Sequence, residues 1–248
     1  MLDYLEYYNE IAPIFNSVRL DREPEFSSTL SVISNNSRIG NVVLDVGCGT
    51  GAYATALQEI GYNVVGIDKS PEQIKIAQQT ISALIGDAID LPFNNASFDL
   101  CLMIMMLHQI DPSERDSAFS ETTRVLRRGG KLIIKTQSHD DLKHRKTSVF
   151  FPKAFEYNLI RYPEISNLCN RLRKFGHVRE LSTRTVITQT VEEILSNLKN
   201  KGTSSVAMLT SQEFRDGFQK AEAFYSQFES LVDKNVFHTY IILQKETD

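Results

Sequence analysis

The segment Leu44-Asp-Val-Gly-Cys-Gly-Thr-Gly51 decides the fold of this 248-residue chain. It ends an apolar run over residues 41–46, which predicts a buried strand, and continues into a glycine-rich turn. Glycines at every second position allow backbone conformations with φ > 0 and let a ligand approach closely. Asp45 stands just before the first glycine, where a carboxylate would repel the pyrophosphate groups that bind bare N–H groups at helix N-termini. The turn therefore predicts a site for a cationic or hydroxyl-bearing ligand.

Strand and helix signals alternate around this turn. The predicted strands span residues 41–46, 63–68, 83–85, 98–105 and 131–136. A first helix is predicted over residues 50–60 and is closed by Gly61. A second begins at the capping box Ser70-Pro-Glu-Gln73. A third spans residues 111–130 and is ended by Gly129-Gly130. Strands separated by helices indicate a parallel sheet with right-handed crossovers. Ligands of such sheets bind at the carboxyl ends of the strands.

The rest of the chain follows another pattern. Residues 137–162 mix charged and aromatic side chains without clear periodicity, which predicts a loop or lid near the ligand. A helix is expected over 163–175, a strand over 177–186, helices over 190–232 and a strand over 236–244. Capping boxes at Thr190-Val-Glu-Glu193 and Thr210-Ser-Gln-Glu213 support the helices. The last two strands predict a hairpin at the sheet edge, split by a helical insertion.

These elements predict an α/β fold with a Rossmann-like, doubly wound sheet of seven strands, mostly parallel with the last strand antiparallel. We expect a single domain over residues 1–248. Within it, residues 1–40 would form a helical cap, residues 41–136 the ligand-binding core, and residues 137–248 the substrate lid, edge strands and helical insertion.

Composition narrows the function classes. The chain is 42% hydrophobic and 23% charged, as expected of a globular protein, and its net charge of −4 provides no global attraction to nucleic acid or to an anionic membrane. Three scattered cysteines without CxxC spacing argue against a disulfide framework or a metal site and fit a reducing compartment. The N-terminus has no signal-peptide pattern, and the apolar run over residues 98–107 is too short to cross a bilayer. We therefore expect a cytoplasmic protein that needs no metal.

Polar groups follow each of the first four strands at the edge where a ligand would lie. Asp45 and the glycine turn follow the first strand, and Asp68 ends the second about twenty residues further on, where an acid can accept the hydroxyls of a ribose. Asp87-Ala88 follows the third strand and offers an acceptor to an exocyclic amine. Residues 104–108 follow the fourth and form an apolar wall that ends in His108. A ligand with ribose, adenine and a positively charged amino-acid arm would satisfy all four.

Four segments in this order resemble the class I S-adenosylmethionine-dependent methyltransferases: LDVGCGTG, VVGIDKSPEQIKIA, GDAIDLPFNNASFDLCLMIMMLHQI and RVLRRGGKLIIKT. The resemblance covers roughly residues 41–136 and is greatest to the small-molecule branch that includes the ubiquinone and menaquinone biosynthesis enzymes. Residues 8–13 resemble a short N-terminal motif of the family. The resemblance implies S-adenosylmethionine as cofactor, S-adenosylhomocysteine as product, and methyl transfer to an O, N, S or C nucleophile of a small organic molecule.

The resemblance also implies individual roles along the cofactor. The methionine arm would be held by Asp45 and by the turn residues Gly47, Cys48, Gly49, Thr50 and Gly51. The nucleoside would be held by Asp68 at the ribose hydroxyls, Lys69 beside the adenine, Asp87 at the adenine amine and Ala88 through its backbone. Met103 and Ile104 would line the cofactor near the sulfonium, and Tyr8 and Arg19 would close over the methionine carboxylate and methyl group.

His108 allows two interpretations. An imidazole can take a proton from an attacking hydroxyl or amine, and it can instead cap the helix that follows the strand. The basic stretch Lys143-His144-Arg145-Lys146 likewise fits either steering of an anionic substrate or a solvated loop. Cys48 is expected to pack in the turn rather than to act as a nucleophile.

Two other function classes stay open. A nicotinamide-dependent oxidoreductase normally has a GxGxxG turn with no acid before it, and a non-catalytic cofactor-binding protein would keep the same motifs. Among methyltransferases, the segment after the fourth strand lacks the Asn/Asp-Pro-Pro-Tyr/Phe pattern of enzymes that act on base amines, which with the acidic balance predicts no nucleic-acid partner. The aromatic residues of 137–162 favour a ring-bearing acceptor, and a homodimer is left open.

Overall fold

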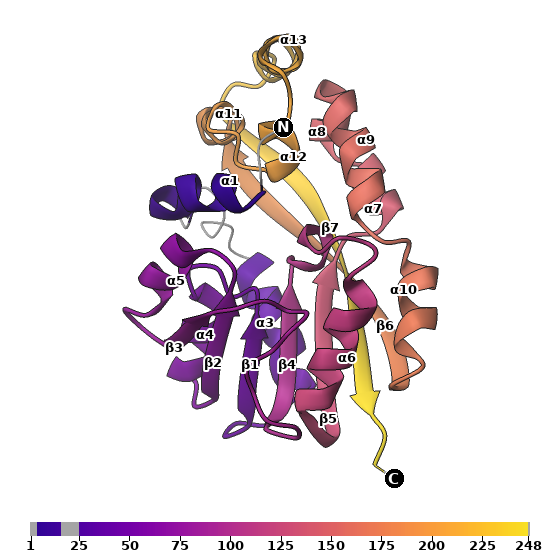
Figure 1. Cartoon of the computed structure of the whole chain (residues 1–248). Helices are drawn as coiled ribbons and strands as arrows, with labels where there is room; N and C mark the ends of the chain where they lie inside the picture. The colour runs from indigo at the N-terminus through magenta and orange to yellow at the C-terminus, as the bar shows by residue number, and fades with distance from the viewer. Residues whose placement is uncertain (1–3, 16–24, 248) are drawn as a thin grey trace.

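The computed structural model describes residues 4–15 and 25–247. Its centre is a seven-stranded sheet with the order β3-β2-β1-β4-β5-β7-β6 (Figure 1). The strands are β1 (Val42–Val46), β2 (Asn63–Asp68), β3 (Ser82–Ile85), β4 (Phe98–Ile104), β5 (Leu126–Thr136), β6 (Gly176–Thr190) and β7 (Leu231–Lys245). β7 runs antiparallel to both of its neighbours, and the pairs among β1 to β5 are parallel. The predicted fold class, with its antiparallel last strand, is confirmed.

Helices cover both faces of the sheet because successive side chains of a strand point to opposite faces. β1 illustrates this: Val43 packs in one apolar cluster with α3 (Glu25–Asn35) and α4 (Ala52–Glu59), whereas Leu44 packs in another with α6 (Arg115–Val125) and α10 (Ile165–Leu172). α5 (Pro71–Ala77) contributes Ala77 to the first cluster. The two clusters fix the positions of the strand ends. They thereby also fix the positions of the polar side chains at those ends.

The hairpin of β6 and β7 is longer than the rest of the sheet. Its strands pair from Gly176 with Lys245 to Thr190 with Leu231, but β5 pairs only with residues 239–244 of β7. The free half of the hairpin rises above the carboxyl edge and carries a helical lobe (Figure 1). The helices of this upper part are α7 (His139–Lys143), α8 (Lys146–Phe150), α9 (Pro152–Arg161), α11 (Val191–Lys199), α12 (Ser204–Ala207) and α13 (Ser211–Tyr225).

The upper lobe has an apolar core of its own. Phe150 and Phe151 pack with Ile194, Leu198 and Tyr225, all of them buried. Side chains of this size each contribute about 1.5–3 kcal/mol when fully buried, so this cluster stabilises the lobe. The lobe lies above the carboxyl edge of the strands (Figure 1).

The helix starts predicted at threonines are confirmed. The Thr190 hydroxyl accepts the N–H of Glu193 at 3.1 Å and the Glu193 carboxylate accepts the N–H of Thr190 at 2.7 Å, and Thr210 and Glu213 form the same reciprocal pair. At α5 only half of the expected capping box forms. The Ser70 hydroxyl accepts the N–H of Gln73, but the Gln73 side chain donates to the backbone oxygen of Tyr8 instead.

Two further predictions of local structure are corrected. Residues 137–162 are mainly helical rather than an irregular loop, and they form α7, α8 and α9. These helices are too short to show clear periodicity in the sequence, which is why the sequence did not predict them. The Gly129-Gly130 pair lies inside β5 rather than at the end of α6, which stops at Val125. The register of β5 against β4 shifts between Phe98 and Leu100, and Gly129 has φ +73°, so the glycines serve a bulge in the strand.

The N-terminal segment contributes α1 (Tyr4–Ile11) and the 3-10 turn η1 (Ala12–Ile14), which lie over the carboxyl edge near α5 (Figure 1). Arg19, predicted to close over the cofactor, lies outside the described residues. No helix in the described parts of the chain combines the length and the hydropathy that crossing a bilayer requires.

Candidate active site

The glycine turn leaves β1 in the conformation that its sequence predicts. Gly47, Gly49 and Gly51 have φ of +73°, +56° and +82°, values that favour glycine. The N–H groups of Gly47 and Cys48 both donate to the carbonyl of Ile67 at the end of β2, at 2.7 and 3.0 Å. A Cβ on Gly47 would lie 2.7 Å from Cβ of Met106, so the turn also needs glycine for space. The first two strand ends are thereby locked together.

Cys48 packs as expected. Its sulfur lies where a Cβ on Gly66 would be only 2.7 Å away, so the thiol fills the space above β2. Burial, followed by the nearby carboxylates of Asp45 and Asp68, raises the pKa of the Cys48 thiol well above its ordinary range. A thiol held in its protonated form is a poor nucleophile. Thr50, next in the turn, is buried.

Asp45 is a buried carboxyl at the end of β1, with 2% of its surface exposed. Burial, and secondarily the charge of Asp68, raise the pKa of Asp45 from 3.8 to about 7. The same pair of carboxyl groups lines a cavity, so a cation placed between them would relieve their repulsion and favour the ionised form. The charge pattern of this part of the cavity fits the ammonium-bearing arm of S-adenosylmethionine.

Asp68 joins the turn to the start of α5. Its Oδ2 accepts the N–H of Gly49 at 2.9 Å and its Oδ1 accepts the N–H of Ser70 at 2.9 Å. Burial raises the pKa of Asp68, whereas these backbone hydrogen bonds oppose the shift. A carboxylate has about four lone-pair sites, so Asp68 keeps acceptor capacity for a ligand hydroxyl.

Lys69 and Asp87 contact each other. Nζ of Lys69 lies 2.6 Å from Oδ2 of Asp87, with side chains 60% and 31% exposed. Ala88 is buried beside them. The residues expected around the adenine therefore lie together at the ends of β2 and β3.

α1 is attached to the cofactor side of the cavity at three points. Gln73 donates to the backbone oxygen of Tyr8 at 3.1 Å, Ser70 donates to the side chain of Asn9 at 2.6 Å, and the Tyr8 hydroxyl accepts from Nε2 of Gln109 at 2.7 Å. These bonds position Tyr8 on the cavity wall. A helix held in this way covers a bound ligand from the solvent side.

The residues at the carboxyl end of β4, which we call the β4 exit, form the predicted apolar wall. One of the residues predicted to belong to it does not. Met103 is fully buried in the core cluster and does not line the cavity, contrary to its predicted contact with the cofactor. The wall consists of Ile104, Met105 and Met106. Met105 adopts φ +53° while its N–H donates to the carbonyl of Lys135 at 2.9 Å. A left-handed non-glycine residue at a strand end is a strained conformation of the kind found at ligand sites.

His108 lies in the 3-10 turn η2 (Leu107–Gln109), is 5% exposed, and stacks on Tyr162 with ring centroids 4.3 Å apart. It does not cap the following helix, because α6 begins only at Arg115. Nε2 of His108 lies 2.8 Å from Nε2 of Gln109. Oε1 of Gln109 accepts from Arg161, whose guanidinium can only donate, at 2.7 Å. The amide NH₂ of Gln109 therefore faces the ring.

This orientation fixes the tautomer of His108. A donor facing Nε2 requires a lone pair on that atom, so the ring proton of the neutral imidazole resides on Nδ1. The lone pair that a general base would use is then already engaged by Gln109. Arg161 and Gln109 are residues that the sequence reading did not identify, because the network joins residues 53 positions apart.

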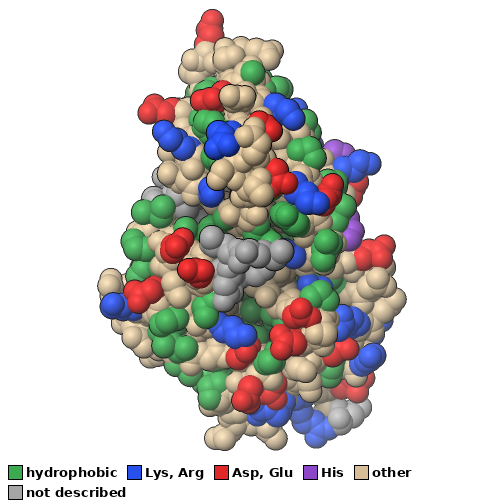
Figure 2. Space-filling view, turned by 45° about the horizontal axis from the view of Figure 1, so that its top comes forward, with side chains coloured by type: hydrophobic (Ala, Val, Ile, Leu, Met, Phe, Trp, Pro, Cys, Tyr) green, Lys and Arg blue, Asp and Glu red, His purple; other side chains and the backbone are tan. Residues whose placement is uncertain are grey.

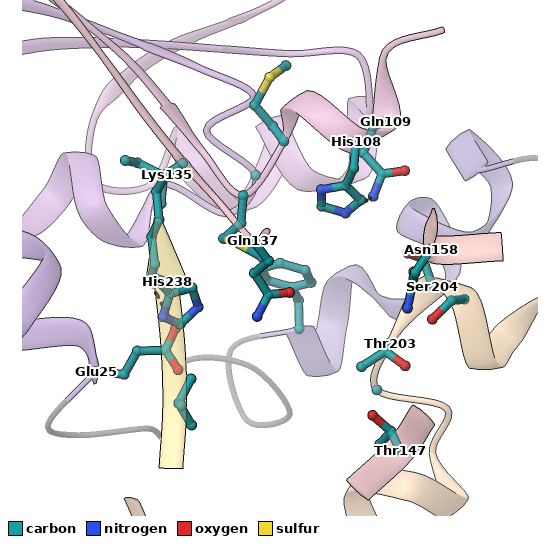
Figure 3. Close-up of a pocket in the computed structure, with 18 of the residues that line it drawn as sticks. Glu25, His108, Gln109, Lys135, Gln137, Thr147, Asn158, Thr203, Ser204 and His238 are labelled. Atoms are coloured by element: carbon teal, nitrogen blue, oxygen red, sulfur yellow. Dashed lines mark hydrogen bonds and ion pairs between the residues drawn. The ribbon is translucent and has the colours of Figure 1, made fainter. Parts of the chain in front are cut away.

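A cavity of about 1140 Å³ extends from the glycine turn to the upper lobe. We use the term upper chamber for its part lined by Lys135, Gln137, Thr147, Asn158, Thr203, Ser204 and His238. Figure 3 shows Gln137 between two walls, with His238 and Glu25 on one side and Asn158 and Ser204 on the other. Pockets for one small ligand usually measure about 300–1,000 Å³, so this cavity has room for a cofactor and a second molecule.

One wall of the upper chamber holds a buried ion-pair cluster. Nζ of Lys135 lies 2.9 Å from Oε1 of Glu25, and Nε2 of His238 lies 3.2 Å from the same oxygen. Lys135 also donates to Thr29 at 3.0 Å. The sequence contained one signal of this cluster: Lys135 directly follows the apolar residues Leu132, Ile133 and Ile134 in the same strand, and its side chain is fully buried.

Comparison with known proteins agrees with this geometry. Residues 44–134 match the protein family described as a methyltransferase domain. A solved protein assigned by name to an antibiotic biosynthesis pathway of Anabaena variabilis is similar with a TM-score of 0.69 at 20% identity, covering 87% of this chain and 96% of that one. Phosphoethanolamine N-methyltransferase 2 of Haemonchus contortus, solved with S-adenosylhomocysteine, is similar with a TM-score of 0.55 at 18% identity, covering 90% of this chain and 53% of that one.

Two curated relatives match about half of this chain or less. The tRNA (carboxymethyluridine(34)-5-O)-methyltransferase alkbh8 of Xenopus tropicalis is 33% identical over 129 residues, which are 51% of this chain and 20% of that protein. The uncharacterized methyltransferase Rv3342 of Mycobacterium tuberculosis is 38% identical over 103 residues, 40% of this chain and 41% of that protein. The matches thus span less than half the length of these relatives.

The sheet, the glycine turn with its adjacent carboxylate and the family match identify residues 44–134 as a methyltransferase domain of the class I S-adenosylmethionine-dependent type, for which S-adenosylmethionine is the cofactor. The resemblance read from the sequence is confirmed at this level. The alternative of a nicotinamide-dependent oxidoreductase is not supported.

The prediction that excluded nucleic acid as a partner is wrong, because the first of these relatives acts, by its name, on tRNA. The net charge of −4 describes the whole chain and not the charges around one cavity. The missing proline-containing motif concerned only enzymes acting on base amines, whereas the relative's name specifies an oxygen.

Proposed function

We propose that this chain transfers the methyl group of S-adenosylmethionine to an oxygen, nitrogen, sulfur or carbon nucleophile of a small organic molecule bound in the upper chamber. The single observation that carries the proposal is the continuity of one cavity from Asp45 to Gln137. The bound cofactor supplies an activated methyl group on a sulfonium. The chain's own residues then have to align the acceptor and exclude water.

Alignment of the two reactants is the larger of the protein's two contributions to lowering the reaction barrier. Holding two reactants in line can supply up to about 7–11 kcal/mol of the barrier. The β4 exit wall fixes one side of the reaction space, and α1, held at Tyr8 and Asn9, covers the cofactor side. Helices α9 and α12 and strand β7 contribute Asn158, Ser204 and His238 to the lining of the chamber, and a closed lining of this kind would limit the access of water.

Proton removal does not follow from His108 in this geometry. Its Nε2 lone pair accepts from Gln109, so the ring proton of the neutral imidazole resides on Nδ1, which is buried. We therefore propose that His108 orients the acceptor or the β4 exit and that the nucleophile is one that reacts without a strong base. Amines that are uncharged near neutral pH belong to this class, whereas phenols and thiols, with ordinary pKa values of about 10 and 8.5, must first lose a proton.

A modified uridine of tRNA is a second candidate acceptor. The name of the Xenopus relative favours it, and so does the position of His144, Arg145 and Lys146, which line the outer part of the cavity and could face phosphates. On the face shown in Figure 2, basic and acidic side chains are interspersed without a large area of one sign. The face shown therefore offers no extended basic area, and a tRNA acceptor would depend on basic residues near the cavity such as Arg145 and Lys146.

Methyl-labelled S-adenosylmethionine separates the two candidates. The protein is incubated with a low-molecular-mass metabolite fraction and, separately, with total tRNA. Label in the metabolite fraction supports the first candidate, and label in tRNA alone supports the second. Absence of transfer to either, with S-adenosylhomocysteine shown to bind, contradicts the proposed activity. The Asp45→Asn variant serves as the control for cofactor-dependent labelling.

A further inference from the structure

Gln137 carries an unused acceptor in the upper chamber. It directly follows β5, is 1% exposed and lines the cavity. Its Oε1 is one of the buried side-chain atoms, within the described residues, that have no hydrogen-bond partner. A buried carbonyl oxygen without a donor costs about 1–3 kcal/mol, and such atoms in a folded protein call for an explanation. A ligand that donates to this oxygen is the explanation developed below.

The orientation of the Gln137 amide follows from its second contact. Nε2 lies 3.4 Å from the backbone oxygen of Phe237, which can only accept, so the NH₂ end faces β7. Oε1 consequently turns to the opposite side. Figure 3 shows this oxygen on the side that carries Asn158 and Ser204, across the open middle of the chamber.

The charges near Gln137 are already paired. Lys135, two residues earlier on the same strand, is neutralised by Glu25 at 2.9 Å, and His238 contacts the same carboxylate at 3.2 Å. An anionic group placed beside Lys135 would have to displace Glu25 from a buried lysine, which leaves one negative charge uncompensated. The cavity also has charged lining residues outside the upper chamber as defined above, namely Asp141, His144, Arg145, Lys146, Asp233 and Lys234. The other polar side chains of the upper chamber, Thr147, Asn158, Thr203 and Ser204, are neutral. This chemistry suits an uncharged ligand.

The rest of the lining is apolar and aromatic. Phe150, Tyr162, Ile187, Val206 and Tyr225 all contribute to the cavity and are buried. Flat, apolar ligand surfaces pack well against such walls, with a few polar groups to fix their orientation. The floor near Gln137 adjoins the β4 exit, because Met105 donates to the backbone of Lys135 at 2.9 Å. A molecule bound here lies next to the cofactor side.

We propose that the upper chamber takes an uncharged, ring-bearing methyl acceptor that donates an N–H or O–H hydrogen bond to Oε1 of Gln137. The inference rests on the proposed function, since it specifies the acceptor class of the same site. Gln137 is a specificity-determining residue in this account. It distinguishes an acceptor with a donor group from the same molecule with that group methylated.

Isothermal titration calorimetry on the full chain saturated with S-adenosylhomocysteine tests this. The probes are 2-quinolone and its N-methyl derivative, 2-naphthol and its methyl ether, and 2-naphthoate as the anionic counterpart. We expect at least one donor-bearing probe to bind about tenfold more tightly than its methylated form, as a buried hydrogen bond of about 1.4 kcal/mol requires. In Gln137→Leu that ratio should fall below about threefold.

Gln189→Leu is the matched control, because Gln189 lines the outer part of the same cavity and accepts from Lys234 at 2.9 Å. It should keep the wild-type ratio, and both variants should bind S-adenosylhomocysteine like the wild type. The proposal is overturned if no donor-bearing probe binds, if methylated probes bind equally well, if 2-naphthoate binds most tightly, or if Gln137→Leu keeps the ratio. Failure of S-adenosylhomocysteine to bind the wild type would instead contradict the proposed function, before any probe is added.

Discussion

Nε2 of Gln109 lies 2.8 Å from Nε2 of His108, and the amide is held in this orientation by Arg161, which donates to its oxygen at 2.7 Å. The arrangement gives His108 an engaged lone pair on Nε2 and a proton on Nδ1. The histidine that the sequence offers as a candidate base thus has its Nε2 lone pair occupied by Gln109. Because this lone pair is engaged, His108 is not available to remove a proton from the acceptor.

The tautomer is directly measurable. In a long-range ¹H–¹⁵N correlation spectrum of the histidine rings, we expect His108 to show a protonated Nδ1 and an unprotonated Nε2. Gln109→Glu replaces the donating amide with an accepting carboxylate and should move the proton to Nε2. An unprotonated Nδ1 in the wild type would contradict the account and restore His108 as a candidate base.

Cofactor affinity should depend on pH through Asp45. Its pKa is raised to about 7 by burial and by Asp68, and a bound ammonium group favours the ionised carboxylate. Below pH about 7 the affinity for S-adenosylhomocysteine should therefore fall as the pH falls, by up to about tenfold per unit for one proton, and level off above it. Calorimetry across this range measures the slope.

Asp45→Asn is the variant for the pH dependence. The amide cannot ionise, so we expect weaker binding with most of the slope removed, and an unchanged fold by circular dichroism. A slope as steep as that of the wild type would assign the titration to another group.

Gly47→Ala should destabilise the chain more than Gly40→Ala. Both glycines have positive φ, +73° and +88°, which costs an alanine about 1–2 kcal/mol. A Cβ on Gly47 would also meet Cβ of Met106 at 2.7 Å, whereas a Cβ on Gly40 would meet nothing within 4 Å. Urea unfolding measures both. Equal losses would show that the Met106 contact relaxes freely.

The Lys135–Glu25 pair should behave as a buried ion pair. Lys135→Met leaves the Glu25 carboxylate without its main partner and should lower the free energy of unfolding by about 3–5 kcal/mol. Lys153→Met, which removes the exposed pair with Glu156, should cost less than about 1 kcal/mol. Denaturant titration compares the two variants. If the two variants lose similar free energies of unfolding, the Lys135–Glu25 pair does not behave as a buried ion pair.

The sequence predicted correctly those features that depend on residues close together in the chain. The strand at residues 63–68 has the predicted bounds, and the capping boxes at Thr190 and Thr210 form as read, because each depends on neighbours within a few residues. The Gly129-Gly130 pair was assigned to a helix end because a left-handed glycine is equally typical of a helix end and of a strand bulge. Only the pairing with β4 distinguishes the two.

The acceptor side of the cavity was less predictable because its contacts are long-range. Lys135 and Glu25 are 110 residues apart, and Gln137 contacts the backbone 100 residues further on. Met103 and Ile104 are neighbours in an apolar run, yet only Ile104 reaches the cavity. The face on which each residue falls depends on how the strand ends, which the run of apolar letters does not specify.

Calorimetric titration of the full chain with S-adenosylhomocysteine, and in parallel with NAD, tests the central claim most directly. We predict saturable binding of one S-adenosylhomocysteine per chain, weakened in Asp45→Asn, and no saturable binding of NAD. Binding of NAD without binding of S-adenosylhomocysteine would contradict the account.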